Sequence, residues 1–184
     1  MNEHTAEQFK AVTSLCQQVF LDKMSDYGPA WRILRTSSLT DQIYIKANRI
    51  RTIQTKPTQL VNEGVEGEFQ GIVNYAVMAI IQLRKGVTDK PDLKADEALS
   101  LYRSTMEEAF GLMTRKNHDY DEVWRKMRVS SLTDIILMKL LRIKQIEDNQ
   151  GNTLVSEGID ANFFDIINYA VFALILLGEA TQHG

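Results

Sequence analysis

Residues 128–146, RVSSLTDIILMKLLRIKQI, decide the fold because almost the same sequence, RTSSLTDQIYIKANRIRTI, occurs earlier at residues 35–53. The run SSLTD occupies 37–41 in the first copy and 130–134 in the second, which sets the offset between them at 93 residues. A match of this length is not a coincidence. It indicates an internal duplication of the chain.

The duplication extends on both sides of this stretch. Upstream, DYGPAWR at 26–32 matches DYDEVWR at 119–125. Downstream, with one more residue of offset, EGVEGEFQGIVNYAVMAIIQL at 63–83 matches EGIDANFFDIINYAVFALILL at 157–177. The repeat therefore covers most of the chain.

A joint separates the two copies near residues 86–96, where Gly86 and Pro91 interrupt any continuing helix. We expect a first repeat unit at 1–88 and a second at 89–184. Two homologous units would most simply pack face to face about a pseudo-twofold axis, because each then buries the apolar surface that the other exposes. The two units are expected to form one compact domain.

Each unit is expected to contain three helices, because apolar residues recur at spacings of three and four. The first helices are predicted at about 6–24 and 93–115. The third helices are predicted to begin near Glu66 and Asp160, and they are apolar on almost every side, as central helices of a bundle are. The predicted fold is all-α, a six-helix bundle.

The second helix of each unit is predicted to begin within SSLTD. Ser38 and Ser131 could cap the free amide groups of these helices. Asp41 and Asp134, three residues later, could reach back to the capping residue. The repeated run is therefore interpreted first as a helix start.

Composition limits the partners. With 21 basic and 24 acidic residues and a net charge of -3, the chain offers no broad basic surface for duplex nucleic acid. The single cysteine, Cys16, cannot form an internal disulfide and points to a reducing compartment. No signal peptide is evident, and the apolar run Tyr169–Gly178 is too short to span a bilayer. We expect a cytoplasmic protein without a membrane partner, and the sequence leaves a homodimer of the whole chain open.

Asp165 and Asn168 are polar residues on one face of an otherwise apolar third helix. In the first unit Asn74 is retained, but Gly71 stands at the position of Asp165. Because the same fold can omit this carboxylate in one copy, Asp165 is a candidate functional residue.

Lys139 and Arg142 lie three residues apart on the second helix of the second unit. Such a pair can bind phosphate or a carboxylate. One alternative is a structural ion pair between Asp165 and either Lys139 or Arg142. Another is that both cations are solvated on the helix flank.

The loop between the first and second helices of the second unit carries Asp119, Tyr120, Trp124 and Arg125. Two aromatic rings with an aspartate and an arginine could stack a nucleobase and hold its edge or its phosphate. The alternative is a rigid corner, in which Trp124 packs on the end of the bundle and Arg125 pairs with Asp119.

Four carboxylates of the second unit are candidate ligands of Mg²⁺: Asp134, Glu157, Asp160 and Asp165. Glu157 and Asp160 are three residues apart at the start of the third helix. The alternative is that acidic residues there are favoured by the helix dipole without any ligand.

The pattern KNHDY, WRKM, SLTDIILMKLLRIKQI and DIINYAVFALILL, spread over residues 116–177, resembles the nucleotide modification associated domain of type one, a bacterial and phage family. The first unit resembles a diverged copy of it, and together the two cover residues 10–178. The resemblance implies an association with systems that modify nucleotides or DNA bases.

A more distant similarity is to all-α nucleoside triphosphate pyrophosphohydrolases of the MazG kind. It implies a helical bundle with Mg²⁺ held by Glu-x-x-Glu on one helix and Glu-x-x-Asp on the next. This chain departs from that pattern, because its second helix has Lys139 and Arg142 but no Glu-x-x-Glu, and its third offers Asp165-x-x-Asn168.

Two interpretations of function follow. The first is a nucleotide-handling protein, either a metal-dependent nucleotide (pyro)phosphohydrolase or a nucleotide-binding protein, with its site in the second unit and the first unit as a scaffold. Lys139 and Arg142 would then meet phosphate, and Trp124 would stack the base. The alternative is a non-catalytic helical module that binds a protein or nucleic-acid partner.

Overall fold

The computed structural model describes residues 3–56, 64–152 and 157–182, and these residues form helices and short connections without a strand. The elements in chain order are α1 Glu3–Tyr27, the 3-10 helix η1 Ala30–Ile33, α2 Thr36–Thr55, α3 Val65–Lys85, α4 Ala95–Tyr120, the 3-10 helix η2 Val123–Lys126, α5 Val129–Asp148 and α6 Ile159–Gln182. The order of a long helix, a 3-10 turn and two further helices thus occurs twice. The prediction of an all-α fold with six main helices is confirmed.

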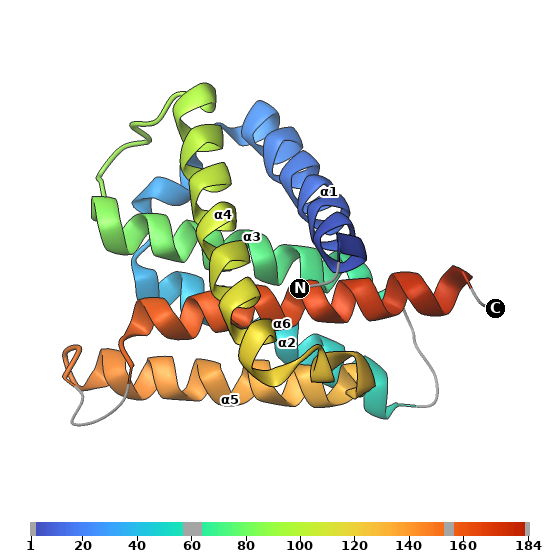
Figure 1. The fold of residues 1–184 in the computed structure, drawn as a ribbon. Helices are drawn as coiled ribbons and strands as arrows, with labels where there is room; N and C mark the ends of the chain where they lie inside the picture. The colour runs from blue at the N-terminus through green and yellow to red at the C-terminus, as the bar shows by residue number, and fades with distance from the viewer. Residues whose placement is uncertain (1–2, 57–63, 153–156, 183–184) are drawn as a thin grey trace.

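The helices pack as two equivalent halves. Within each half α2 packs on α3 and α5 on α6, and across the halves α3 packs on α6 and α2 on α5. The main contacts among the six α-helices all have counterparts when α1, α2 and α3 are exchanged with α4, α5 and α6, as a pseudo-twofold axis requires. In Figure 1, α5 and α6 run side by side, and α1 and α4 cross over the inner helices at a steep angle.

The start of α2 and α5 differs from the prediction. Helix α2 begins at Thr36 and α5 at Val129, in each case one residue before the first serine of SSLTD. Their N-cap residues are Arg35 and Arg128, which make no side-chain capping hydrogen bond. Ser38 and Ser131 are already inside the first turn, where their amide groups bond the carbonyl groups of Arg35 and Arg128 at 3.0 Å. The predicted serine caps were therefore wrong.

The threonine of SSLTD instead joins α2 to α5. The hydroxyl of Thr40, at the start of α2, donates to Glu147 Oε1 at the end of α5 at 2.9 Å. At the equivalent place, Gln54 Nε2, at the end of α2, donates to Thr133 Oγ1 at the start of α5 at 3.2 Å. Both threonines are fully buried, so these bonds fix the antiparallel register of the two helices.

The aspartate of SSLTD makes equivalent ion pairs at the edge of the contact between α2 and α5, which we call the seam. Lys144 Nζ lies 2.6 Å from Asp41 Oδ1, and Arg51 Nε lies 3.6 Å from Asp134 Oδ1. Both aspartates are largely exposed, so each pair contributes little to stability. The run occurs twice because each copy meets the far end of the other helix across the pseudo-twofold axis.

The core is formed mainly by α3 and α6, whose side chains are buried from Phe69 to Gln82 and from Asn162 to Ile175 with few exceptions. By length and composition α6 could cross a membrane over Ile159–Thr181, and it is the one such helix in the described part of the chain. In this fold, 72% of its most apolar window is buried inside the bundle, as in a core helix.

Helix α4 continues to Tyr120, past the predicted end at residue 115. This extra turn places Lys116 and Asn117 on the helix rather than in the loop. The chain leaves α4 through Asp121, which has a φ of 55°, and it leaves α1 through Gly28, which has a φ of 60°. Both residues are in the left-handed region, where glycine is favoured.

A candidate ligand cavity in the second repeat unit

Each repeat unit has a cavity where its first helix and 3-10 turn meet its third helix. The cavity of the first unit measures about 330 Å³, and that of the second unit about 540 Å³. Every residue that lines the first cavity, except Ile33, has its repeat counterpart in the wall of the second. The cavities are therefore duplicated along with the fold.

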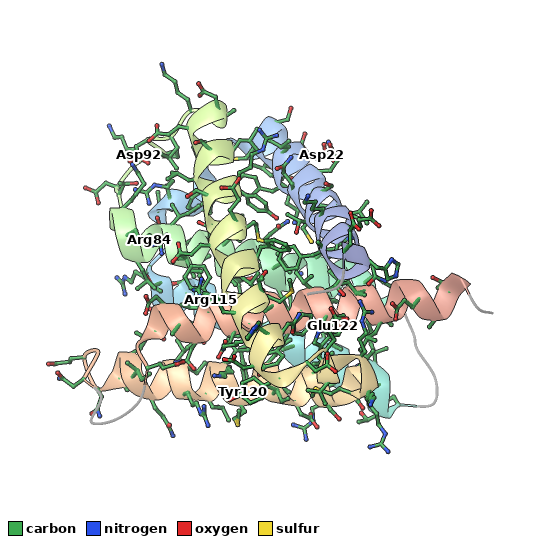
Figure 2. All side chains as sticks on the ribbon, in the orientation of Figure 1. Asp22, Arg84, Asp92, Arg115, Tyr120 and Glu122 are labelled. Atoms are coloured by element: carbon green, nitrogen blue, oxygen red, sulfur yellow. The ribbon has the colours of Figure 1, made fainter. Side chains whose placement is uncertain are left out.

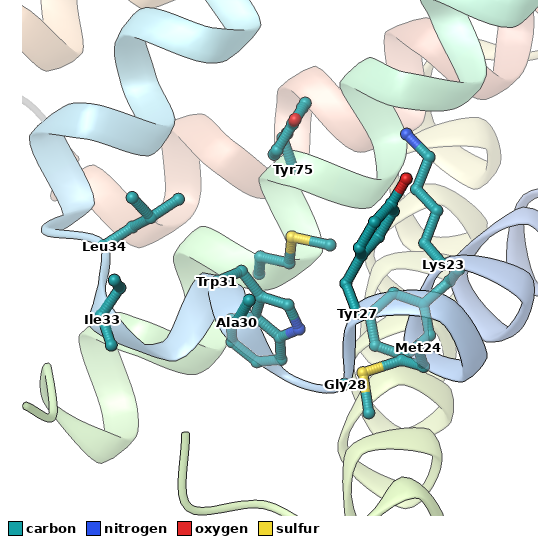
Figure 3. A pocket seen from close by; sticks show the side chains of 11 residues that line it. Lys23, Met24, Tyr27, Gly28, Ala30, Trp31, Ile33, Leu34 and Tyr75 are labelled. Carbon is teal, nitrogen blue, oxygen red and sulfur yellow. The ribbon is translucent and has the colours of Figure 1, made fainter. Parts of the chain in front are cut away.

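Four lining residues are identical in the two cavities: a lysine, two tyrosines and a tryptophan, which are Lys23, Tyr27, Trp31 and Tyr75 in the first unit and Lys116, Tyr120, Trp124 and Tyr169 in the second. Figure 3 shows the first of these sets around the first cavity. Figure 2 shows Tyr120 at the end of α4, where the chain turns toward η2 and α5.

The second cavity is the more polar of the two. Asn117 stands in place of Met24, and Asp121 in place of Gly28. Lys139, Glu157, Asp165 and Asn168 also line the second cavity, whereas Lys46, Gly71 and Asn74, the counterparts of Lys139, Asp165 and Asn168, do not line the first. Gly71 replaces Asp165 in the first unit, and there the stem of Lys46 fills the space, with Cε 2.5 Å from where a Cβ of residue 71 would stand.

Asp165 is buried between two lysines. Lys139 Nζ lies 2.6 Å from Asp165 Oδ2, and Lys116 Nζ is hydrogen-bonded to Asp165 Oδ1. Burial lowers the pKa of Lys116, but the hydrogen bond and charge of Asp165 raise it by more, so the pKa lies above its ordinary value. Of the two cations weighed from the sequence, Lys139 is the one that meets Asp165, and Lys116 is a partner that the sequence did not indicate.

In the first unit the carboxylate of the equivalent ion pairs lies about one helical turn earlier on the third helix. Glu68, at the position of Asn162, accepts from Lys46 Nζ at 3.2 Å and from Arg49 Nη1 at 2.9 Å. Arg142, the counterpart of Arg49, is exposed on α5. The lysine on the second helix thus meets a carboxylate of the third helix in both units, but only the second unit places that carboxylate in the cavity wall.

Three buried polar atoms of the second cavity have no hydrogen-bond partner among the described residues. They are Asn117 Nδ2, Trp124 Nε1 and Asn168 Oδ1. All three side chains line the cavity, and each residue is at most 8% exposed. A buried polar atom without a partner costs about 1–3 kcal/mol. Trp31 Nε1, of a residue that lines the first cavity, is unpaired in the same way.

The repeat explains why Asn168 is incompletely bonded. In the first unit, Asn74 Nδ2 donates to the carbonyl of Cys16 at 3.0 Å, and Tyr102 donates its hydroxyl to Asn74 Oδ1 at 2.8 Å. In the second unit, Asn168 Nδ2 donates to the carbonyl of Ala109 at 3.1 Å. The counterpart of Tyr102 is Phe9, which has no hydroxyl.

Trp124 is a packing residue of the cavity wall. Its ring stacks on Phe172 with centroids 4.2 Å apart and an interplanar angle of 5°. The guanidinium of Arg125 lies over the same ring, 4.4 Å from its centroid. Trp124 is only 4% exposed, so its face does not offer a platform for a base. Tyr120, which is 73% exposed at the cavity, is the accessible ring.

Arg125 forms the rigid corner that the sequence offered as one alternative, although its partner is not Asp119. It donates to Glu122 and Glu179, at 2.8 Å each. It also donates to Thr5 and Gln8 on α1, at 2.7 and 2.6 Å. Asp119 lies instead beside His118, 3.1 Å from Nδ1, and both are exposed.

The four carboxylates considered for Mg²⁺ are not brought together. Asp134 lies on the seam between α2 and α5, Asp160 is exposed in the first turn of α6, and Glu157 lines the cavity together with Asp165. Within the described residues, no three His, Cys, Asp or Glu side chains are placed to hold a metal ion. Since both oxygens of Asp165 accept from lysines, the cavity does not present the ligand set of a resident Mg²⁺. The metal site stays a prediction.

The sequence model of the family described as nucleotide modification associated domain 1 matches residues 23–83 and residues 116–177. The chain belongs to this family. It carries the domain twice, and the two matches begin at Lys23 and Lys116, the equivalent lysines of the two cavities. Apart from Phe20 and Met113, all residues that line the cavities fall inside the matched segments.

Comparison with curated proteins gives no match, and neither does comparison with solved structures. The likeness to MazG-like pyrophosphohydrolases is not shown by the family match. The cavity-lining residues that sequence reasoning missed are chiefly Lys116, Asn117 and Tyr169. A signal for Asn117 was present, because Met24 occupies its place in the other repeat.

Proposed function

We propose that the protein binds a nucleotide or nucleoside in the cavity of the second unit and does not hydrolyse it. The observation that carries the proposal is the larger and more polar cavity of the second unit, whose wall combines Asn117, Asp165 and Asn168 with the exposed ring of Tyr120. Membership of a family associated with nucleotide modification supports the choice of ligand class.

The size and walls of the cavity suit such a ligand. Its volume of about 540 Å³ is within the usual range for small-molecule sites. Tyr120 and Tyr169 supply aromatic surface, and Tyr169 packs edge-on against Phe172, with centroids 6.3 Å apart. Aromatic side chains of this kind stack nucleobases.

The pairing of Asp165 and Arg125 argues for binding rather than for catalysis by these two residues. Asp165 is already neutralised by Lys116 and Lys139, and Arg125 is held by four partners of the corner. Neither the carboxylate nor the guanidinium is left to activate water or to stabilise a developing charge. The first unit, whose Asn74 is fully bonded, is proposed to act as the scaffold of the second.

Thermal unfolding of the purified chain, with and without nucleosides, nucleoside mono- and triphosphates and Mg²⁺, tests the proposal, because a ligand of the native state raises the melting temperature by mass action. Tyr120→Ala should weaken binding about tenfold, the effect expected for one lost stacking contact. Tyr27→Ala is the matched control, since Tyr27 is equally exposed, at 73%, in the first unit. Equal ligand shifts for both variants would reject the second-unit site.

A further inference from the structure

We infer that the cavity of the first unit is a second small-molecule site, and that it takes an aromatic carboxylate smaller than a nucleotide. The inference goes beyond the proposed function, because it concerns the unit that serves as the scaffold of the nucleotide site. Two features of the first cavity lead to it: the charge that its wall leaves unpaired, and the aromatic and thioether side chains that surround it.

The first cavity differs from the second in charge. Among the described residues its wall holds one charged side chain, the ammonium of Lys23, and no carboxylate. Lys23 is exposed and makes no ion pair within the described part of the chain. In the second unit the equivalent Lys116 is paired with Asp165, and Asp121 stands where the first unit has Gly28. The first cavity therefore complements an anion.

The other lysine close to this cavity is already neutralised. Lys46 Nζ lies 5.9 Å from the ring centroid of Tyr75, but it is also 3.2 Å from Glu68 Oε2. Lys23 is thus the group that meets the anion. One ammonium group on a flexible stem suits a single carboxylate, whereas a polyphosphate would require several cations.

The buried part of the wall is apolar and polarisable. Its side chains are each at most 8% exposed, and they include Met24, Trp31 and Met78. Thioether groups adapt to the shape of a ligand and make favourable contacts with aromatic rings. The cavity measures about 330 Å³, at the lower end of the usual range for small-molecule sites.

The outer part of the wall combines the charge with aromatic rings. Tyr27 is 73% exposed and Tyr75 is half-buried. Figure 3 shows the side chains of Lys23 and Tyr27 extending in the same direction from the end of α1. A planar ligand could therefore stack on a tyrosine ring while its carboxylate meets the ammonium group.

A nucleotide does not complement this wall. Its sugar hydroxyls and base edge require hydrogen-bonding side chains, but Met24 and Gly28 stand where the second cavity has an amide and a carboxylate. Asn74 lies outside the wall, and both ends of its amide are already bonded. The ligand is therefore less polar than a nucleotide, with a planar ring system and one carboxylate.

Calorimetric titration of the full chain with 2-naphthoate tests the inference, with 2-naphthylmethanol as the neutral probe and 2-naphthylmethylamine as the cationic one. The carboxylate should bind at least about threefold more tightly than the alcohol, and the amine most weakly, because Lys23 attracts only the anion. Raised salt should reduce this preference. In a ¹H–¹⁵N spectrum, 2-naphthoate should shift the indole resonance of Trp31 and leave that of Trp124 in place.

Variants of the first cavity identify the groups involved. Lys23→Gln should abolish the preference for 2-naphthoate over the alcohol. Lys10→Gln is the control, since Lys10 is an exposed lysine of the same helix outside the cavity wall. Gly28→Asp, which installs the residue of the second unit, should weaken 2-naphthoate by repulsion. The backbone tolerates this change, because Asp121 has a φ of 55° at the equivalent place.

Tyr27→Ala should weaken all three probes, because it removes an aromatic ring and no charge. An equal affinity for the three probes, or no binding of 2-naphthoate, would overturn the inference. A preference that persists in Lys23→Gln or disappears in Lys10→Gln would overturn it too, as would a shift of the Trp124 indole alone. These results leave the nucleotide site standing, because nucleotide titrations test that site in the other cavity.

Discussion

Asn74 and Asn168 occupy the same position in the two repeat units, but only Asn74 has both ends of its amide hydrogen-bonded. The hydroxyl of Tyr102 donates a hydrogen bond to Asn74 Oδ1 at 2.8 Å, whereas Asn168 Oδ1 has no hydrogen-bond partner among the described residues. The difference arises because Phe9 of the first unit, the repeat counterpart of Tyr102 of the second, has no hydroxyl to offer Asn168. The two repeat units thus contain the same buried asparagine, with both ends of its amide hydrogen-bonded in the first unit and the oxygen unbonded in the second.

Phe9→Tyr should therefore supply the hydrogen bond that Asn168 Oδ1 lacks. The added hydroxyl is expected to reach Asn168 by the symmetry of the repeat, to stabilise the fold by about 1 kcal/mol and to weaken ligand binding in the cavity. Urea denaturation measures the first effect and calorimetric titration the second. The reciprocal control, Tyr102→Phe, should cost about 1–3 kcal/mol because it leaves Asn74 Oδ1 buried and unpaired. A destabilised Phe9→Tyr variant with unchanged binding would refute this account of Asn168.

Asp165→Asn should destabilise the protein, because it leaves the ammonium of Lys139 nearly buried without its counter-charge. The side chain of Lys139 is 11% exposed, and removal of one partner from a buried pair costs about 3 kcal/mol. The control is Asp134→Asn, whose pair with Arg51 is largely exposed and should be worth less than about 1 kcal/mol. Chemical denaturation at neutral pH compares the two. Equal effects would show that the burial of Asp165 does not matter.

Glu147 makes stability depend on pH between acid and neutral conditions. Burial raises its pKa above the ordinary value of 4.5, against the hydrogen bond from Thr40, and the charge of Asp41 raises it further. Because the folded-state pKa is raised, the stabilisation is present below the unfolded-state pKa and is lost as pH rises through the folded-state value. Glu147→Gln, which copies Gln54 of the first unit, should remove this loss.

The expected gain of Glu147→Gln at neutral pH is less than about 1 kcal/mol, because Glu147 is only half-buried and is screened by solvent. Melting temperatures of the variant and the wild type, measured from pH 4 to pH 8, should diverge as pH rises. Gln54→Glu is the matched control and should add a second loss of stability with rising pH at the other end of the seam. Parallel curves for all three proteins would contradict this assignment.

Asp121→Gly should stabilise the end of α4. Asp121 has a φ of 55°, and Gly28 holds the equivalent place after α1 with a φ of 60°. The left-handed region costs a residue with a Cβ about 1 kcal/mol relative to glycine. Gly28→Ala should lose a similar amount, and differential scanning calorimetry can measure both. If Asp121→Gly lowers the melting temperature, the aspartate side chain stabilises this turn by more than its backbone strain costs.

The architecture could be predicted from the sequence because the internal repeat restricts the possible arrangements of the helices. A fixed offset between SSLTD runs, together with apolar third helices, predicted two equivalent three-helix units. The serine caps failed because local hydrogen-bonding potential cannot distinguish a helix start from a position one turn further along. The real role of Thr40 and Asp41 depends on the far end of another helix, which a local pattern does not contain.

The site could be predicted only in part, for a related reason. Asp165 and Asn168 were identifiable because polar residues interrupt an apolar helix, and Lys139 was identifiable as a partner. Lys116 and Asn117 were missed because α4 extends one turn beyond the residues that carry its apolar pattern. The unpaired state of Asn168 follows from Phe9, which is distant in sequence and belongs to the other repeat unit.

The most direct test of the second-unit cavity as the binding site uses the two tryptophans of the chain, because one indole N–H belongs to each cavity. A ¹H–¹⁵N spectrum should contain two indole resonances, assigned with Trp31→Phe. Addition of a nucleoside or nucleotide that raises the melting temperature should shift the Trp124 resonance and leave that of Trp31 in place. A shift of Trp31 alone, or of neither indole at saturating ligand, would contradict the proposed site.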